Sequence, residues 1–269
     1  MLFNNINRNM TEKTLCKFSI LGVIISAINM DDACSVVKEA VAKRQKKYIC
    51  VCPVSTIMEC QKDNQVLESV NSADLVTPDG MPVVWLGRML GHKNISRVYG
   101  PGLMDEVCAI SAKSGFKNYL YGSTQEVLGK LKERLTKKYP NLIISGMFSP
   151  PFRKLSDDED NKIVEELNNN APDIIWVGLG SPKQDLWMHE HRERINAPVL
   201  IGVGAAFDFL AGTKLQAPRW ISNAGFEWLF RLATEPKRLW RRYLVNNTLF
   251  MYFVIVGLFS RAHKSLLNK

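Results

Sequence analysis

The chain has 269 residues, of which 46% are hydrophobic and 23% charged, and its formal net charge is +9. These fractions are typical of a folded protein and exclude disorder as the main state. The 17 glycines and 12 prolines are too few for a collagen-like or low-complexity chain. The positive charge indicates an anionic partner, which could be nucleic acid, a nucleotide, a sugar phosphate or an anionic lipid.

The positive charge is concentrated near the C-terminus. Residues 231–269 contain eight Lys or Arg and one acid, Glu235, which gives this segment a local charge of +7. The remainder is therefore close to neutral. A protein that wraps nucleic acid usually spreads basic residues over its binding face, so this distribution favours a basic terminal appendage.

The six cysteines all lie within the first 108 residues, and none forms a C-x-x-C pair. We expect reduced, mostly buried thiols of a cytosolic protein rather than a set of disulfides. Cys50 and Cys52 are two residues apart in an apolar run, so on a strand they would face the same side.

The first apolar run, around residues 19–26, is too short to cross a bilayer, which needs about 20 apolar residues. We expect it to form the first core strand. Further strands are predicted at residues 48–54, 75–78, 117–121, 142–146, 174–178 and 199–203. Helical spacing between them is clearest at residues 125–138 and 156–169, where Ser156 and Glu159 form a capping-box pattern. This alternation predicts an α/β fold, with a Rossmann-like, mostly parallel sheet and helices on both faces.

The pattern changes after residue 204, where the chain becomes helical and rich in Trp and Arg. We predict an α/β catalytic domain over residues 1–210 and a helical, basic C-terminal appendage over residues 211–269. An apolar run at residues 248–260 has basic flanks, which suits a helix in a membrane interface, with Phe250, Phe253 and Leu258 in contact with lipid. The alternative is a helix that docks on the protein itself or on another subunit, so a homo-oligomer remains open.

Ligands of α/β proteins bind beyond the carboxyl ends of the strands, so the loops there are candidate sites. Asp79, in Thr77-Pro78-Asp79-Gly80, is either a turn residue or a general base. Gly122, followed by Ser123 and Thr124, could bind phosphate through backbone N–H groups, although N-capping explains the same residues.

Two glycine-containing loops follow the last two predicted strands. Gly178-Leu179-Gly180-Ser181-Pro182 precedes Lys183 and Gln184 at the start of a helix, which predicts a diphosphate or nucleotide site. The small residues at 202–206 allow a ligand to approach closely, and Asp208 is either a ligand contact or a helix cap.

Other patterns have weaker functional interpretations. Asp158-Glu159-Asp160 resembles the D-x-D motif of metal-dependent glycosyltransferases, but it falls in a helical first turn, where acids are favoured, and we expect a solvated face. The absence of G-x-G-x-x-G disfavours an NAD-dependent oxidoreductase. A nucleic-acid-binding module is the other alternative, because tryptophans and arginines alternate after residue 219. We expect no bound metal and no cofactor.

Taken together, the loops resemble the WecG/TagA/CpsF family of bacterial glycosyltransferases. The resemblance covers residues 19 to 243. In the α/β part its motifs are Pro78-Asp79-Gly80, Arg97 with Gly100, the loop 178–184 and residues 202–208. In the C-terminal part they are Ala217-Pro218-x-Trp220 and the long string Gly225-x-Glu227-Trp228-x-x-Arg231-Leu232-x-x-Glu235-Pro236-x-Arg238-x-x-Arg241-Arg242-Tyr243.

The resemblance implies inverting, metal-independent transfer of a hexosyl or N-acetylhexosaminyl group from a UDP-sugar to a polyprenyl-diphosphate-linked sugar. It places the reaction at the inner face of the plasma membrane, in the synthesis of a surface polysaccharide such as an exopolysaccharide. It also implies that the appendage reaches the membrane and covers the active site, and that no nucleic acid is bound.

By the same resemblance, Asp79 takes the position of the proposed catalytic base and Arg97 that of a residue needed for activity. From the loops and the motifs together, we expect substrate contacts from Gly80, Gly122, Gly180, Lys183, Gln184, Asp208, Arg231 and Arg238.

Two segments depart from the family pattern. Residues 51–56 read Val-Cys-Pro-Val-Ser-Thr where the family has a Thr-Pro-Asn-like run, and Gln216 precedes Ala217-Pro218 where the family has Arg. Polar contacts in a binding site decide which sugar hydroxyls are recognised. The identity of the sugar, the acceptor linkage and the polymer are therefore left open.

Overall fold

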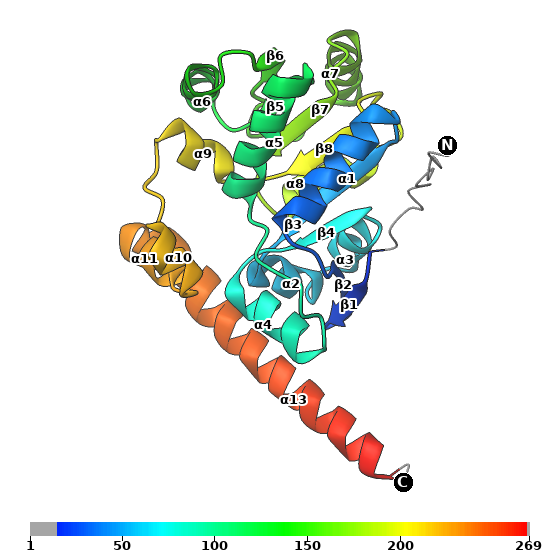
Figure 1. Cartoon of the computed structure of the whole chain (residues 1–269), viewed down its shortest axis with the longest axis vertical. Helices are drawn as coiled ribbons and strands as arrows, with labels where there is room; N and C mark the ends of the chain where they lie inside the picture. Colours follow the sequence, from blue (N-terminus) through cyan, green and yellow to red (C-terminus); the bar gives the residue numbers. More distant parts are fainter. Residues whose placement is uncertain (1–14, 268–269) are drawn as a thin grey trace, which may run out of the picture.

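The computed structural model describes residues 15–267, apart from the side chains of Arg219, Asn223, Arg242 and residues 257–267. Its centre is a six-stranded sheet in the order β4-β3-β8-β7-β5-β6, in which every neighbouring pair is parallel (Figure 1). The strands are β3 (Lys47–Cys52), β4 (Leu75–Pro78), β5 (Lys117–Gly122), β6 (Ile143–Phe148), β7 (Ile174–Gly178) and β8 (Val199–Gly202). The predicted parallel α/β sheet is confirmed.

Helices cover both faces of this sheet. One core contains residues of α1 (Met30–Ala42), α5 (Gly100–Ser114), α6 (Gln125–Lys138) and α9 (Ala206–Ala211). The other contains residues of α2 (Val54–Cys60), α3 (Asn64–Asn71), α4 (Met81–Met89), α7 (Asp157–Asn169) and α8 (Lys183–His191). Successive strand residues alternate between the cores, so that Cys50 and Cys52 share one face, as predicted, while Val51 points to the other. All six cysteines are free thiols, and four are buried.

The prediction of one core strand at residues 19–26 is wrong. The segment forms an antiparallel hairpin, β1 (Lys17–Ile20) and β2 (Val23–Ser26), which lies beside β4 as a separate two-stranded sheet. Leu21 and Gly22 have φ angles of 50° and 81°. Positive φ at both central residues is what a type I′ hairpin turn requires, and this turn interrupts the apolar run.

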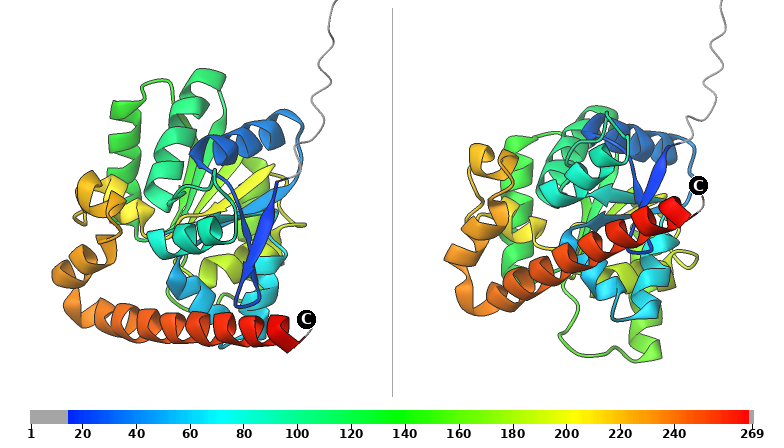
Figure 2. Two further views of the ribbon diagram at one scale, coloured as in Figure 1. Left: turned by 60° about the horizontal axis from the view of Figure 1, so that its bottom comes forward. Right: turned by 90° about the horizontal axis from the view of Figure 1, so that it is seen from below.

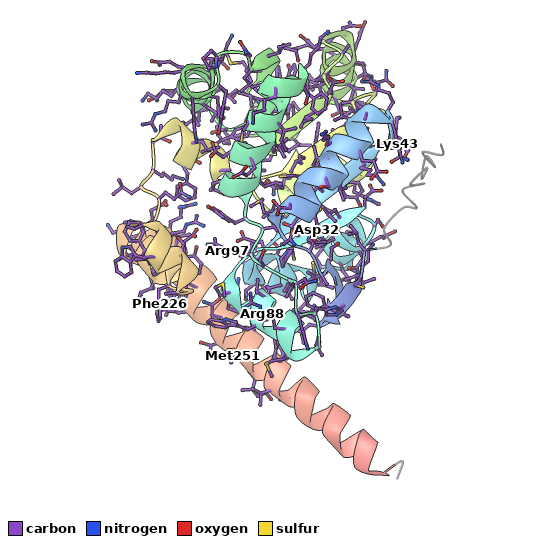
Figure 3. All side chains as sticks on the ribbon, viewed as in Figure 1. Asp32, Lys43, Arg88, Arg97, Phe226 and Met251 are labelled. Atoms are coloured by element: carbon purple, nitrogen blue, oxygen red, sulfur yellow. The ribbon has the colours of Figure 1, made fainter. Side chains whose placement is uncertain are left out.

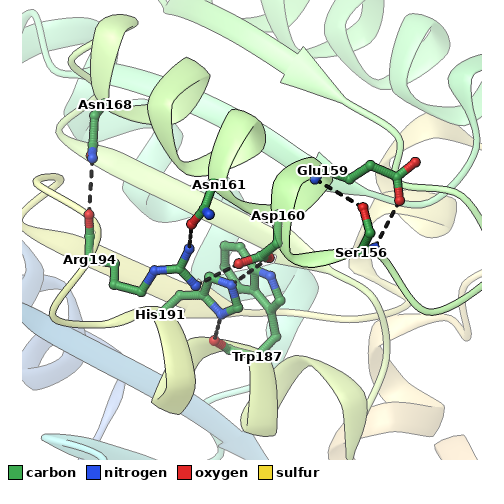
Figure 4. A network of polar contacts seen from close by, with 8 residues as sticks. All are labelled: Ser156, Glu159, Asp160, Asn161, Asn168, Trp187, His191 and Arg194. Carbon is green, nitrogen blue, oxygen red and sulfur yellow. Dashed lines mark hydrogen bonds and ion pairs between the residues drawn. The ribbon is translucent and has the colours of Figure 1, made fainter.

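The acidic run at residues 158–160 has a structural role (Figure 4). The Glu159 carboxylate accepts a hydrogen bond from the Ser156 backbone N–H, and the Ser156 hydroxyl accepts one from the Glu159 N–H, which confirms the predicted capping box. Asp158 is exposed, as expected of a solvated face. Asp160 instead turns towards α8, where it lies 2.8 Å from His191 Nε2 and 2.6 Å from Arg194 Nη1.

The C-terminal segment is helical, as predicted. It comprises α10 (Arg219–Asn223), α11 (Glu227–Thr234), α12 (Pro236–Trp240), a π-helical turn η1 (Arg241–Val245) and the long helix α13 (Asn246–Leu267). Figure 2 shows α13 running across one end of the molecule, where it packs on α2. The division into units at residue 210 remains a prediction.

Helix α13 has one face on the protein and another exposed. Phe250 is only 2% exposed and belongs to the core next to α2, so the expectation that it contacts lipid is wrong. Met251, Tyr252 and Ile255 are 45–60% exposed, and Phe253 is 39% exposed. Leu258 lies outside the described side chains. No helix in the described part of the chain is long and apolar enough to cross a membrane.

Glycines line the carboxyl edge of the sheet, where β5, β7 and β8 lie side by side. Gly122 pairs with Gly178 in register, and a Cβ on Gly122 would lie 2.6 Å from the Gly178 carbonyl carbon. Gly122 also has a φ of 121°, which side-chain-bearing residues rarely adopt. Close packing of two strand ends therefore requires glycine at this position.

Gly122→Ala should lower the free energy of unfolding by more than about 2 kcal/mol. The methyl group would be overpacked against the Gly178 backbone, and the positive φ would strain the alanine, so the two costs add. Urea denaturation would measure this. Gly129→Ala is the matched control: its Cβ would meet nothing within 4 Å on the exposed side of α6, and alanine there should add about 0.5–1 kcal/mol. Equal stability of the two variants would refute the packing role of Gly122.

Candidate active site

A cavity of about 430 Å³ opens at the carboxyl ends of the parallel strands. Its lining comes from the segments that follow β3, β4, β5, β7 and β8, together with residues of α11 and α12. Seven of the ten residues with a predicted role line it: Asp79, Arg97, Gly180, Gln184, Asp208, Arg231 and Arg238. The sheet and the C-terminal helices therefore enclose one site between them.

Asp79 stands directly after β4, where its backbone N–H donates to the Cys52 carbonyl (3.3 Å) and holds it at the sheet edge. Gly80 follows with a φ of 93° and caps the start of α4. The Asp79 side chain is 19% exposed. Burial raises the pKa of this carboxyl above its ordinary value, and the charge of Glu227 raises it further, while Arg97 and Arg231 act in the opposite direction.

Arg97 joins two carboxylates. Its Nε lies 3.2 Å from Asp79 Oδ1, and its Nη2 lies 2.7 Å from Glu227 Oε2. Its guanidinium carbon stands 4.4 Å from the centre of the Tyr99 ring. Burial lowers the pKa of Arg97, but the two carboxylates outweigh it, so the guanidinium remains charged. We call this chain of contacts, Asp79–Arg97–Glu227, the carboxylate bridge.

The carboxylate bridge connects parts of the chain that are distant in sequence. Asp79 and Arg97 belong to the α/β unit, and the Val98 N–H donates to the Pro78 carbonyl (3.0 Å), which keeps their segments adjacent. Glu227 is the first residue of α11. Figure 3 shows Arg97 between the sheet and the C-terminal helices. No site role was predicted for Glu227, although it stands in the Gly225-x-Glu227-Trp228 motif.

Gln184 shapes the glycine loop after β7. Its side chain is only 3% exposed, and its Oε1 accepts a hydrogen bond from the Gly180 N–H (3.1 Å). Beneath the loop, the Ser181 hydroxyl donates to Asp185 Oδ2 (2.6 Å) and lies 2.9 Å from the Thr56 hydroxyl. Burial raises the pKa of Asp185 to about 6. The predicted contact residue Gln184 therefore also fixes the cavity wall.

Basic side chains lie on the side of the cavity formed by the C-terminal segment. Arg231 stands 5.1 Å from the centre of the Phe209 ring, and Arg238 makes a two-pronged contact with Glu235 (2.6 and 2.8 Å). Lys214 Nζ is 3.5 Å from Asp208 Oδ1. Cations of this kind can bind an anionic group, and in this structure Arg238 and Lys214 are paired with the carboxylates of Glu235 and Asp208.

Three residues predicted to contact substrate lie outside this cavity. Gly122 is buried behind the sheet edge, Lys183 is exposed and does not line the cavity, and Gly80 lines a smaller neighbouring cavity. On a helix, adjacent residues point about 100° apart, so Lys183 and Gln184 cannot both face the site. The roles of these three residues in substrate binding remain predictions.

The sequence of this chain is similar to those of known glycosyltransferases. The model of the glycosyl transferase WecG/TagA/CpsF family matches residues 18–264. The N-acetylglucosaminyldiphosphoundecaprenol N-acetyl-beta-D-mannosaminyltransferase of Bacillus subtilis is 28% identical over 183 residues, which cover 68% of this chain and 69% of that protein. The enzyme of the same name from Staphylococcus aureus strain NCTC 8325 is 32% identical over 186 residues, covering 69% and 70% of the two chains. This chain belongs to the WecG/TagA/CpsF family of glycosyl transferases.

Proposed function

We propose that this glycosyltransferase transfers a hexosyl or N-acetylhexosaminyl group, with inversion and without a metal ion, from a UDP-sugar to a polyprenyl-diphosphate-linked sugar. The main support for this proposal is Asp79, a partly buried carboxylate in the wall of a cavity that also has basic residues. The names of the relatives describe a transfer of N-acetylmannosamine to a lipid-diphosphate-linked N-acetylglucosamine. Family membership favours this activity over the dehydrogenase and the nucleic-acid-binding module that the sequence alone left open.

The reaction is a single displacement at the anomeric carbon. The acceptor oxygen forms a bond to that carbon, the bond to the diphosphate oxygen breaks, and UDP leaves with the bonding electrons. Asp79 takes the proton of the acceptor hydroxyl. Burial raises the pKa of Asp79, which makes its carboxylate a stronger base, while Arg97 favours the ionised form.

The leaving diphosphate needs positive charge on its side of the cavity. Arg231, Arg238 and Lys214 line the cavity and supply that charge. Guanidinium groups suit phosphate because they donate two parallel hydrogen bonds. Two of these residues belong to α11 and α12, so the C-terminal helices complete the donor site as well as cover it.

The acceptor is anchored in a membrane, and we place the enzyme on the cytoplasmic face of that membrane. Exposed apolar side chains of α13 and the local charge of +7 over residues 231–269 support this position. Each basic residue near an anionic leaflet contributes about 1 kcal/mol. Such a surface gives reversible adhesion and brings the enzyme to the plane of its acceptor.

Asp79→Asn should reduce kcat by about 10²–10⁴-fold, because the amide cannot accept the hydroxyl proton. UDP release with a lipid-linked acceptor measures the loss, and a thermal melt checks that the variant is folded. Near-normal turnover by the folded variant would remove Asp79 from the role of base.

Glu227→Gln should move the acid limb of the kcat/KM–pH profile to lower pH. Asp79 must be ionised to act as a base, and loss of the Glu227 charge removes an influence that raises its pKa. Glu39→Gln, which alters an exposed carboxylate paired with Lys43 on α1, is the control and should leave the limb in place. An acid limb that is unchanged in Glu227→Gln would contradict the electrostatic coupling of the two carboxylates.

Replacement of both Met251 and Ile255 by Glu should weaken binding to anionic vesicles about tenfold or more, because two exposed apolar side chains lose their contact with lipid. Sedimentation with vesicles of phosphatidylglycerol and phosphatidylcholine measures this. Ile143→Glu, at an exposed position of β6, serves as the control. Equal sedimentation of all three proteins would show that α13 has only a packing role.

A further inference from the structure

A second, smaller cavity also borders the carboxylate bridge. It is enclosed by the start of α4, by α10 and α11, and by the junction of η1 with α13. The two cavities share five lining residues: Pro53, Asp79, Arg97, Glu227 and Arg231. Asp79 therefore lines both cavities, and a group bound in either one can lie next to it.

An inverting displacement requires the donor diphosphate and the acceptor hydroxyl to lie on different sides of the reacting carbon, so we assign them to different cavities. The attacking oxygen and the leaving oxygen lie on opposite sides of the anomeric carbon, and the base must be next to the attacking oxygen. The larger cavity contains Lys214, Arg238 and the glycine loops, which suit the diphosphate. The smaller cavity then lies on the side from which the acceptor hydroxyl approaches.

The lining of the smaller cavity fits a sugar attached to a diphosphate. Met81, Pro82, Trp228 and Tyr243 provide apolar and aromatic surface. The Nε atom of Arg231 is buried without a hydrogen-bond partner in the described part of the chain. An unpaired buried donor is costly, so this atom is available to an anionic or hydroxyl group bound beside it.

The smaller cavity also leads towards exposed apolar surface. A Cβ added to Gly225, which lines the cavity, would lie 3.2 Å from both Met81 Cβ and Trp85 Cη2. Trp85 thus lies next to Gly225, which lines the cavity, and it is 49% exposed. Met89, one helical turn further along α4, is 73% exposed and shares that face of the helix.

We propose that this smaller cavity is the acceptor site. It binds the sugar–diphosphate head of a polyprenyl-linked acceptor with its hydroxyl towards Asp79, and Trp85 and Met89 contact the first units of the isoprenoid chain. The proposal rests on the proposed function, because it assigns a place to the acceptor of that reaction. It also makes α4 a second apolar element that meets the lipid, besides α13.

The test is steady-state kinetics with a UDP-sugar as donor and polyprenyl-diphosphate-linked N-acetylglucosamine as acceptor, with chains of three and eleven isoprene units. Met81→Ala and Asn247→Asp change lining residues from α4 and α13, and each should raise the acceptor KM at least fivefold and leave the donor KM unchanged. Trp85→Ala should raise the acceptor KM for the long chain more than for the short one.

Two control variants separate the cavities. Lys214→Ala, in the larger cavity alone, should raise the donor KM and leave the acceptor KM unchanged. Trp220→Ala removes a tryptophan that is 73% exposed and lines neither cavity, and it should change neither constant. Thermal melts establish that each variant is folded.

An unchanged acceptor KM in the folded Met81 and Asn247 variants, or a donor KM that rises as much as the acceptor KM, would overturn the assignment. If the proposed function itself is wrong, the result differs, because the unmodified enzyme would then release no UDP with any lipid-linked acceptor.

Discussion

The position of one guanidinium group determines much of this active site. Arg97 holds Asp79 on one side and Glu227 on the other, and so joins the carboxyl edge of the sheet to the C-terminal helices. A carboxylate in a partly dry site tends to become neutral, and a nearby cation opposes that tendency. The bridge therefore serves two purposes: it keeps Asp79 ionised, and it places α11 where Arg231 can face the cavity.

The rest of the fold provides room for this arrangement. Glycines at the ends of β5, β7 and β8 let the strand ends and the following loops approach closely, and Gln184 fixes the loop after β7. The C-terminal helices then divide the space above the sheet edge into two cavities with Asp79 between them. Apolar side chains of α13 are exposed on the same segment, so the helices that line the active site also carry the surface that we propose for membrane contact.

Local patterns in the sequence predicted the local structure well. The bounds of α6 and α7 follow from apolar spacing and caps, and Asp79 and Gln184 were found because ligands bind at strand ends. The hairpin turn at Leu21-Gly22 was missed because Gly22, the one residue that marks a break in the apolar run, was read as part of a strand, and nothing in the sequence marks Leu21 as left-handed. Glu227 was missed as a partner of Arg97 because 130 residues separate them and only the folded chain brings them together. Phe250 was misassigned because the sequence shows that a helix is apolar, but not which face is covered.

As the base of an inverting displacement, Asp79 must face the anomeric carbon from the side opposite the leaving diphosphate. A crystal structure with a non-hydrolysable UDP-sugar analogue would reveal this arrangement. We expect the UDP diphosphate against Arg231 and Arg238 in the larger cavity, and the Asp79 carboxylate on the far side of the anomeric carbon, towards the smaller cavity. A sugar whose anomeric carbon points away from Asp79, or a UDP diphosphate in the smaller cavity, would rule out this role for Asp79.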